Sequence, residues 1–348
     1  MWAADKEKAY VNALISEINT YAEQFPNILI QTIFFGGGTP TLLRTHHIQQ
    51  ILNTLLTRFD SHPNIEITME MNPELHHLHK LQALYQLGIN RISLGVQSLI
   101  KHELKRLGRR HTPGEIRHSF DMIKTAGFSN ISADYMFGLP QSTLENVQYN
   151  LQELIELEPS HISTYHLSIE PNTDFYRQNL RPITPKLSQQ QYHIIRTFLI
   201  KNGYPQYEIS NFSKPGYQSH HNLAYWTFKP YIGLGPSAHS FFNQLRYRNV
   251  KPLHQYIQSP YPSVLKSSKW PKTSSSILLK EYIMVQLRLT QGINLIDINH
   301  RFNINFLEKF RRPLHTLSQN NLLSLDHHSI RTTPKGAVVL DEILQLFM

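Results

Sequence analysis

Short apolar runs rich in β-branched and aromatic residues alternate with amphipathic stretches through the first half of the chain. The length and composition of these runs predict five β-strands, at 28–35, 65–71, 91–96, 130–136 and 161–169. Helical spacing of the apolar positions predicts helices before and between them, at 5–24, 45–59, 76–87, 100–107, 113–126 and 142–157. Alternation of this kind predicts an α/β fold with a parallel sheet and its helices packed outside.

The alternation ends after residue 171. A helix is expected at about 188–202, followed by an aromatic region with glycines, and the range 250–276 is rich in Pro, Ser and Lys with little periodicity. We expect three parts: a main domain over 1–249, a linker over 250–276 and a second domain over 277–348. The end of this second domain predicts a small winged-helix-like unit, with a helix at 314–323, a short two-stranded wing and a helix at 335–346.

Composition adds limits on location and chemistry. No run approaches the roughly 18 apolar residues of a membrane span, and the first residues lack the apolar core of a secretory signal, so a cytoplasmic protein is expected. The 348 residues include no cysteine, which excludes disulfides, thiolate nucleophiles and a thiolate-bound iron–sulfur cluster made by these residues alone. The formal net charge of +9 favours acidic partners without selecting one.

Polar and glycine residues follow four consecutive predicted strands. Parallel sheets and barrels place their ligand sites at the carboxyl ends of the strands, so these residues are expected to meet at one rim. Three glycines let a ligand approach the main chain closely, and carboxylate, amide and guanidinium groups suit a zwitterionic nucleoside. The candidate residues are Gly37, Gly38, Thr39, Glu70, Gln97, Arg109 and Asp134.

Several motifs, in order and spacing, resemble the HemN/HemW group of radical S-adenosylmethionine (SAM) proteins. In the first half of the chain they are Gly36-Gly37-Gly38-Thr39-Pro40-Thr41, Glu70-Met71-Asn72-Pro73-Glu74, Arg91 to Ser98, Leu107-Gly108-Arg109 and Asp134 with Gly138-Leu139-Pro140. They continue with Ile169-Glu170-Pro171-Asn172-Thr173, His221-Asn222-Leu223-Ala224-Tyr225-Trp226 and Gly233 to Ser240, and the last two are similar to the HemW branch. The resemblance covers nearly the whole chain.

The resemblance implies a partial TIM-type barrel of parallel βα units, a SAM cofactor and a [4Fe–4S] cluster. It implies that the seven candidates above line the SAM site, with Ser168 and His239 as weaker members. It further implies a haem-binding chaperone that delivers haem to acceptor proteins, and the histidines near the branch motifs, His220, His221 and His239, are the candidate haem ligands. With 20 histidines in the chain, a given one is more often a surface or hydrogen-bonded residue.

The chain departs from the family at the cluster. The family's first strand leads into a loop with three cysteines that hold the cluster, and this sequence is expected to begin beyond that loop, with the first barrel strand absent. Either the true start lies upstream or cluster chemistry has been lost. The strand at 28–35 is then expected to have an open edge where the protein self-associates.

Two other functions remain open at this point. One is an oxygen-independent coproporphyrinogen III oxidase of porphyrin biosynthesis, which would need the cluster. The other is a nucleic-acid-binding protein that uses the winged unit and the positive charge. The final helix carries Asp341 and Glu342 and has no row of Arg and Lys, so nucleic acid is the less favoured partner.

Overall fold

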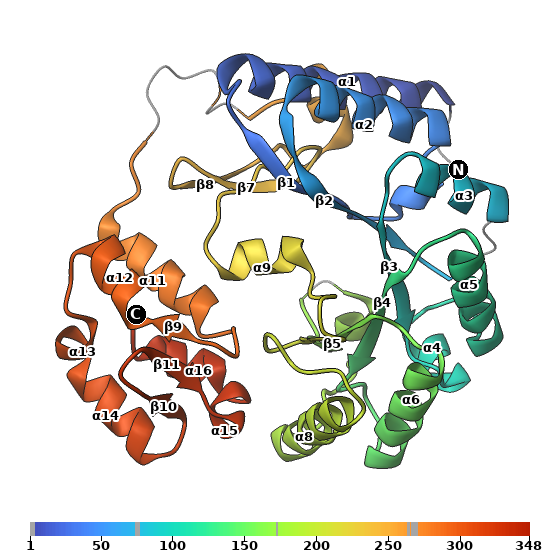
Figure 1. Cartoon of the computed structure of the whole chain (residues 1–348). Coiled ribbons are helices and arrows are strands. Elements are labelled where there is room, and N and C mark those ends of the chain that lie inside the picture. The colour runs from blue at the N-terminus through green and yellow to red at the C-terminus, as the bar shows by residue number, and fades with distance from the viewer. Residues whose placement is uncertain (1–3, 74–76, 172, 263–264, 266–270) are drawn as a thin grey trace.

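The computed structural model describes residues 4–73, 77–171, 173–262, 265 and 271–348. Its main domain is built on a six-stranded sheet with the strand order β1-β2-β3-β4-β5-β6. The first five strands are parallel, and β6 pairs antiparallel with β5. The sheet curls into an open half-barrel (Figure 1). Its strands are β1 Leu29–Phe35, β2 Asp60–Met71, β3 Arg91–Gln97, β4 Asn130–Phe137, β5 His161–His166 and β6 Asn211–Ser213.

Side chains alternate between the two faces of the sheet, as in any strand. In β3 the apolar residues Ile92, Leu94 and Val96 are fully buried in the main core, whereas Ser93 and Gln97 lie on the other face. The convex face is therefore apolar and covered by helices, and the concave face is polar. Helices of this domain are α1 Ala4–Gln24, α2 Thr45–Arg58, α3 Leu78–Gln86, α4 Lys101–Arg106, α5 Pro113–Thr125, α6 Leu144–Glu156, α7 Asp174–Arg177, α8 Pro185–Lys201, α9 His220–Trp226 and α10 Leu253–Gln258, with a 3-10 turn at Pro40–Leu42.

The expected partial barrel of parallel βα units is confirmed, with differences at the ends of elements. Strand β2 begins at Asp60, earlier than the apolar run at 65, because it continues along β1. Strand β5 ends at His166. The short β6 was not predicted, since its pairing with β5 is a long-range contact that three residues of sequence cannot signal.

The carboxyl-terminal domain has a three-stranded sheet in the order β10-β11-β9 and an apolar core that also includes Phe228 and Phe241 of the main domain. The wing is present, but the helix expected at 335–346 is two short helices separated at Val338 and Val339. The elements here are α11 Ser275–Gln286, β9 Ile293–Asn294, α12 Leu295–Phe302, α13 Phe306–Lys309, α14 Arg311–Gln319, β10 Leu323–Leu325, β11 Ser329–Thr332, α15 Pro334–Ala337 and α16 Leu340–Gln345.

The range expected to be a linker contains a packed helix, α10, while residues 263–264 and 266–270 lie outside the described residues. Tyr256 of α10 is fully buried, and its hydroxyl donates to the buried carboxylate of Glu17 on α1 at 2.6 Å. Glu17 also accepts from the backbone N–H of Gly235 and the side chain of Asn249. This cluster fastens the segment around the β7–β8 hairpin, His239–Phe242 and Leu245–Arg248, to the first helix.

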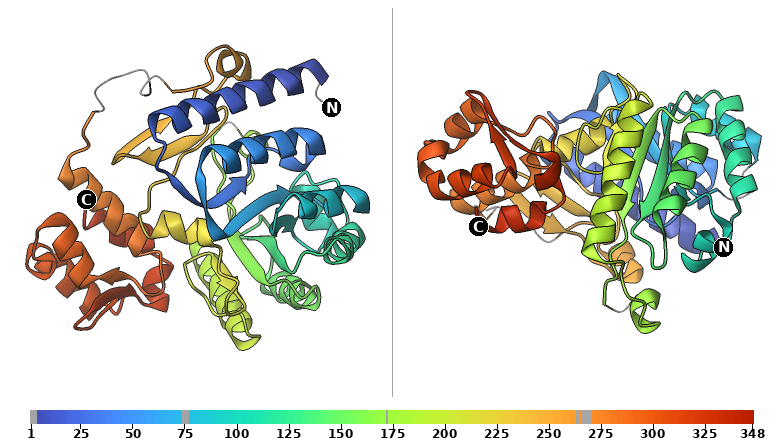
Figure 2. Two further views of the ribbon diagram at one scale, coloured as in Figure 1. Left: turned by 45° about the horizontal axis from the view of Figure 1, so that its top comes forward. Right: turned by 90° about the horizontal axis from the view of Figure 1, so that it is seen from below.

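Strand β1 is the edge of the half-barrel, as expected, because it pairs with β2 alone among the described strands. Its neighbourhood is not bare: Ile30 and Ile33 pack in one apolar cluster with Ile232 and Tyr247 from the hairpin region. Figure 2 shows the hairpin lying beside this end of the sheet. Self-association at the edge stays a prediction, and the chain's own hairpin region contributes apolar cover there.

No helix among the described residues combines the length and the apolar character needed to cross a membrane.

Candidate functional site

One cleft opens at the carboxyl ends of β1 to β4. It encloses about 190 Å³. Seven of the nine residues predicted to bind SAM lie around it, so folding brings together groups that are up to 97 positions apart in the sequence. The lining residues are Gly37, Gly38, Thr39, Pro40, Glu70, Met71, Asn72, Ser93, Gly95, Gln97, Arg109 and Asp134.

The backbone of the glycine motif forms one wall. Gly37 has φ +100°, a conformation that disfavours any residue with a side chain, and its N–H donates to Oε2 of Glu70 at 3.1 Å. A Cβ at Gly37 or Gly38 would meet nothing within 4 Å, so the space beside both is open. On the opposite wall a Cβ at Gly95 would lie 2.9 Å from Nε2 of Gln97, which itself has the unusual φ of 65°. A ligand can therefore approach the main chain closely at Gly37 and Gly38, whereas at Gly95 the side chain of Gln97 occupies that space.

Two carboxylates dominate the electrostatics of the cleft. Burial and, to a smaller extent, the nearby Asp134 raise the pKa of Glu70 to about 7, although the hydrogen bond from the Gly37 N–H acts to lower it. Burial also raises the pKa of Asp134, although Ser93 donates to both of its oxygens at 3.0 and 2.9 Å. Such a pair stabilises a ligand with a cationic centre, because a cation offsets both the burial and the mutual repulsion.

This pair predicts that cation binding depends on pH. The folded-state pKa of Glu70 lies above its usual 4.5, so Glu70 gains its charge only as the pH rises through about 7, and the protein loses stability as the pH rises from about 4.5 to about 7. SAM binding measured by calorimetry from about pH 6 to pH 8 is therefore expected to strengthen with pH through this titration. Glu70→Gln is expected to bind more weakly and to lose most of that dependence, and any residual slope in the variant reports the titration of Asp134 or of the ligand itself. Equal slopes in both proteins would contradict the assignment.

Ser93, Asn72 and Gly95 belong to the cleft but were absent from the predicted set. Ser93 was detectable, because it lies two and four residues before Gly95 and Gln97 on the same face of a strand. Asn72 Nδ2 donates to Thr39 Oγ1 at 3.1 Å and ties the second rim loop to the glycine motif. Ser168 follows β5 and His239 opens β7; both are exposed and neither is among the residues lining the cleft, so their roles stay predictions.

The three candidate haem ligands have different surroundings. His220 and His239 are exposed. The ring of His221 is engaged on both sides, with Nδ1 at 2.8 Å from Oγ1 of Thr32 and Nε2 at 2.8 Å from the hydroxyl of Tyr225. It also stacks on Phe34 at 4.9 Å between ring centroids. Burial lowers the pKa of His221 to about 4, so its ring is neutral and holds α9 against β1.

The residues present do not fit an iron–sulfur cluster. Thiolates are its usual ligands, and the sequence contains no cysteine. Among the described residues no group of three or more His, Asp or Glu side chains is arranged to hold a metal ion. The cleft does fit SAM, since it offers carboxylates for the cationic end, a bare glycine wall and the Arg109 guanidinium.

Comparisons with known proteins bear on the fold and the family of this chain. The model of the Radical SAM superfamily matches residues 3–154, and that of the HemN C-terminal domain matches residues 277–339. Among solved structures, coproporphyrinogen III oxidase (HemN) from Escherichia coli superposes with a TM-score of 0.83 at 23% identity, covering 100% of this chain and 85% of that one. The half-barrel thus has the fold of HemN, and residues 3–154 of the chain match the Radical SAM superfamily.

Sequence relatives narrow the class. Heme chaperone HemW of Bacillus subtilis is 32% identical over 345 residues, covering 97% of this chain and 91% of the relative. Heme chaperone HemW of Lactococcus lactis is 30% identical over 345 residues, covering 98% and 89%. The chain belongs to the HemW family.

Proposed function

We propose that this protein is a HemW-like haem chaperone, which binds haem and passes it to acceptor proteins, and that its rim cleft binds SAM. The observation that carries the proposal is the similarity to proteins named heme chaperone along nearly the whole chain, including the segment that builds α9. Haem is the cargo in this proposal, whereas SAM is a ligand of the rim cleft.

Within the cleft, this chain's own residues account for binding and orientation. Glu70 and Asp134 supply negative charge for the cationic end of SAM, and Arg109 supplies a fork of donors for its carboxylate. The open wall at Gly37 and Gly38 admits the ligand against the main chain. These roles require no electron transfer.

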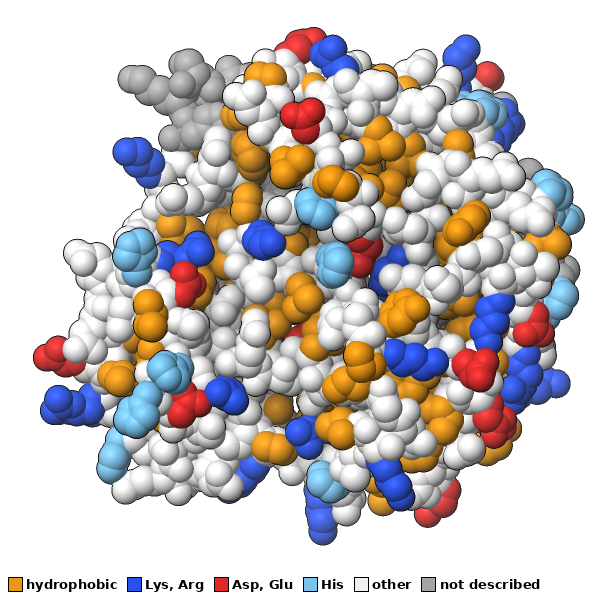
Figure 3. Space-filling view, viewed as in Figure 1, with side chains coloured by type: hydrophobic (Ala, Val, Ile, Leu, Met, Phe, Trp, Pro, Cys, Tyr) orange, Lys and Arg blue, Asp and Glu red, His pale blue; other side chains and the backbone are white. Residues whose placement is uncertain are grey.

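Two other functions have less support. A coproporphyrinogen oxidase would need cluster chemistry, for which these residues supply no thiolate. Nucleic-acid binding would need basic side chains gathered on one face. On the face seen in Figure 3, the Lys and Arg side chains are scattered among acidic and apolar ones.

Haem titration tests the proposal. The purified chain is expected to bind haem with a shift of the Soret band, and replacing the iron ligand by alanine is expected to weaken binding roughly tenfold or more. Because their rings are exposed, His220 and His239 are the first residues to replace. His221→Ala removes two hydrogen bonds of α9 and is expected to act through the position of that helix.

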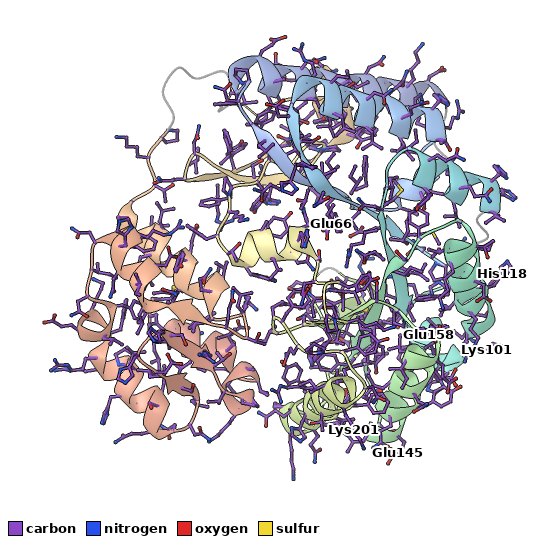
Figure 4. The ribbon with its side chains drawn as sticks, in the orientation of Figure 1. Glu66, Lys101, His118, Glu145, Glu158 and Lys201 are labelled. Carbon is purple, nitrogen blue, oxygen red and sulfur yellow. The ribbon has the colours of Figure 1, made fainter. Side chains whose placement is uncertain are left out.

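His118 provides a matched control. It is exposed on α5, and Figure 4 shows it on the outside of the half-barrel, away from α9. His118→Ala is expected to leave the Soret titration unchanged. A wild-type chain without any spectral change on adding haem would contradict the chaperone proposal.

A further inference from the structure

A chain of hydrogen bonds crosses the interior of the half-barrel from the cleft to the start of α9. Oγ of Ser132 lies 3.3 Å from Oδ1 of Asp134 and 2.8 Å from Nδ1 of His161. Nε2 of His161 lies 2.8 Å from the hydroxyl of Tyr207, and that hydroxyl lies 3.4 Å from the backbone nitrogen of Ser219. Ser219 is the N-cap of α9. The cleft and the helix are therefore linked by three side chains.

All the hydrogen bonds in this series can run in one direction, with each group donating to the next from Ser219 toward Asp134. Burial keeps the pKa of His161 well below its usual value, and the charge of Arg91 lowers it further, so the ring is neutral with one donor and one acceptor nitrogen. Ser132 donates to Asp134, and its oxygen then accepts from Nδ1–H of His161. Nε2 accepts from Tyr207, whose oxygen accepts from the Ser219 N–H. Each hydrogen is donated once.

Burial of its central members makes this series of hydrogen bonds sensitive to the loss of one bond, although Asp134 and Tyr207 are only partly buried. Ser132, His161 and Ser219 have no exposed surface. Away from solvent a lost hydrogen bond leaves a polar group unsatisfied, which costs more free energy than at the surface, and neighbouring bonds polarise one another.

The start of α9 is also held by a buried carboxylate. Glu66 of β2 accepts from the N–H of His220 at 2.9 Å and of His221 at 3.0 Å, and from Oγ of Ser219 at 3.4 Å. Figure 4 shows Glu66 beside α9, inside the half-barrel. At its other end α9 reaches the carboxyl-terminal domain, where Gln286 Nε2 donates to the carbonyl of Trp226 at 2.8 Å. A movement of α9 would therefore change contacts with both domains.

We infer that Ser132, His161 and Tyr207 are positioning residues that couple ligand binding at Asp134 to the position of α9. A cation bound by Asp134 competes for the same carboxylate oxygen that Ser132 uses, and the change passes along the chain to the N–H of Ser219. By thermodynamic linkage, whatever holds α9 also changes ligand affinity in the cleft. The coupling to haem rests on the proposed function, because His220 and His221 are on α9.

Amide hydrogen exchange tests the coupling with SAM as the probe and without haem. Adding saturating SAM to the full chain is expected to change the exchange rates of amides 219–226 by roughly fivefold or more, the lower end of typical coupling free energies. Tyr207→Phe keeps the ring and removes the hydroxyl from the chain. This variant is expected to bind SAM with no change at α9.

Tyr204→Phe is the matched control, because its buried hydroxyl donates to the carbonyl of Pro159 outside the chain of bonds. It is expected to behave as the wild type. An equal response of α9 in Tyr207→Phe and wild type would overturn the inference, as would an unchanged α9 in wild type with SAM bound. Failure of the wild type to bind SAM would overturn it together with the assignment of the cleft.

A haem arm separates this inference from the proposed function. Haem affinity measured with and without SAM is expected to differ in wild type and Tyr204→Phe and to be equal in Tyr207→Phe. A chain that binds no haem but responds to SAM at α9 would contradict the chaperone proposal and support the coupling. A protein that binds haem but shows no effect of SAM on haem affinity or on α9 would support the chaperone proposal and contradict the coupling.

Discussion

Replacing Glu66 by alanine is expected to lower the free energy of unfolding by about 2–4 kcal/mol, because it leaves buried donors without an acceptor. The donors are the N–H groups of His220 and His221 and the hydroxyl of Ser219. Urea unfolding followed by circular dichroism measures the change. The start of α9 is expected to lose its protection from hydrogen exchange in the same variant.

Glu23→Ala is the control for charge removal. The Glu23 side chain is 71% exposed and makes a 3.7 Å ion pair with Arg58, so its loss is expected to change stability by less than about 1 kcal/mol. Glu66→Gln is expected to fall between the two, since an amide keeps one acceptor oxygen. Equal stabilities of Glu66→Ala and Glu23→Ala would show that α9 does not depend on this carboxylate.

Gly38→Leu is expected to abolish SAM binding in the cleft while leaving the fold intact. A Cβ at Gly38 meets no atom within 4 Å, and the backbone there is not in the left-handed region, so the side chain fits at the position without strain. Because Gly38 lines the cleft, the leucine side chain then occupies the space that the ligand needs. The expected loss is roughly a hundredfold or more in affinity, about 2.7 kcal/mol.

Calorimetry with SAM and thermal unfolding of the same variant check both halves of this expectation. Gly114→Ala on α5 is a control, because a Cβ there is 3.9 Å from Oγ1 of Thr112 and lies outside the cleft. Unchanged SAM affinity in Gly38→Leu would show that the ligand does not approach the glycine wall. A large fall in its melting temperature would show that the space beside Gly38 is needed for folding.

The half-barrel has two different environments. The carboxylate pair and the glycine wall lie at its rim, and the series of hydrogen bonds lies below them. The rim holds charged groups that are open to a ligand, whereas the buried side chains of His161 and Glu66 below it are engaged in hydrogen bonds within the protein. In the proposed function, the rim binds SAM while α9 carries two of the candidate haem ligands, His220 and His221. Cargo binding and cofactor binding then need not share atoms.

The alternation of the first half of the chain and four of the residues at the rim could be predicted from the sequence. Alternating apolar runs and amphipathic stretches predict parallel βα units because burial imposes a period on each element, and carboxyl ends of parallel strands share one edge. Gly37, Glu70, Gln97 and Asp134 could therefore be assigned to one rim before any coordinates. The composition alone also shows that the chain has no cysteine to hold an iron–sulfur cluster.

The contacts beneath that rim could not be predicted from the sequence. The pairing of β6, the packed helix within the expected linker and the contacts of Glu66 join segments separated by tens to more than a hundred residues, and local periodicity carries no information about such pairs. The same holds for the histidines. His220 and His221 are neighbours in sequence, yet one is exposed and the other is hydrogen-bonded at both ring nitrogens, because α9 turns one of them toward Thr32 of a distant strand.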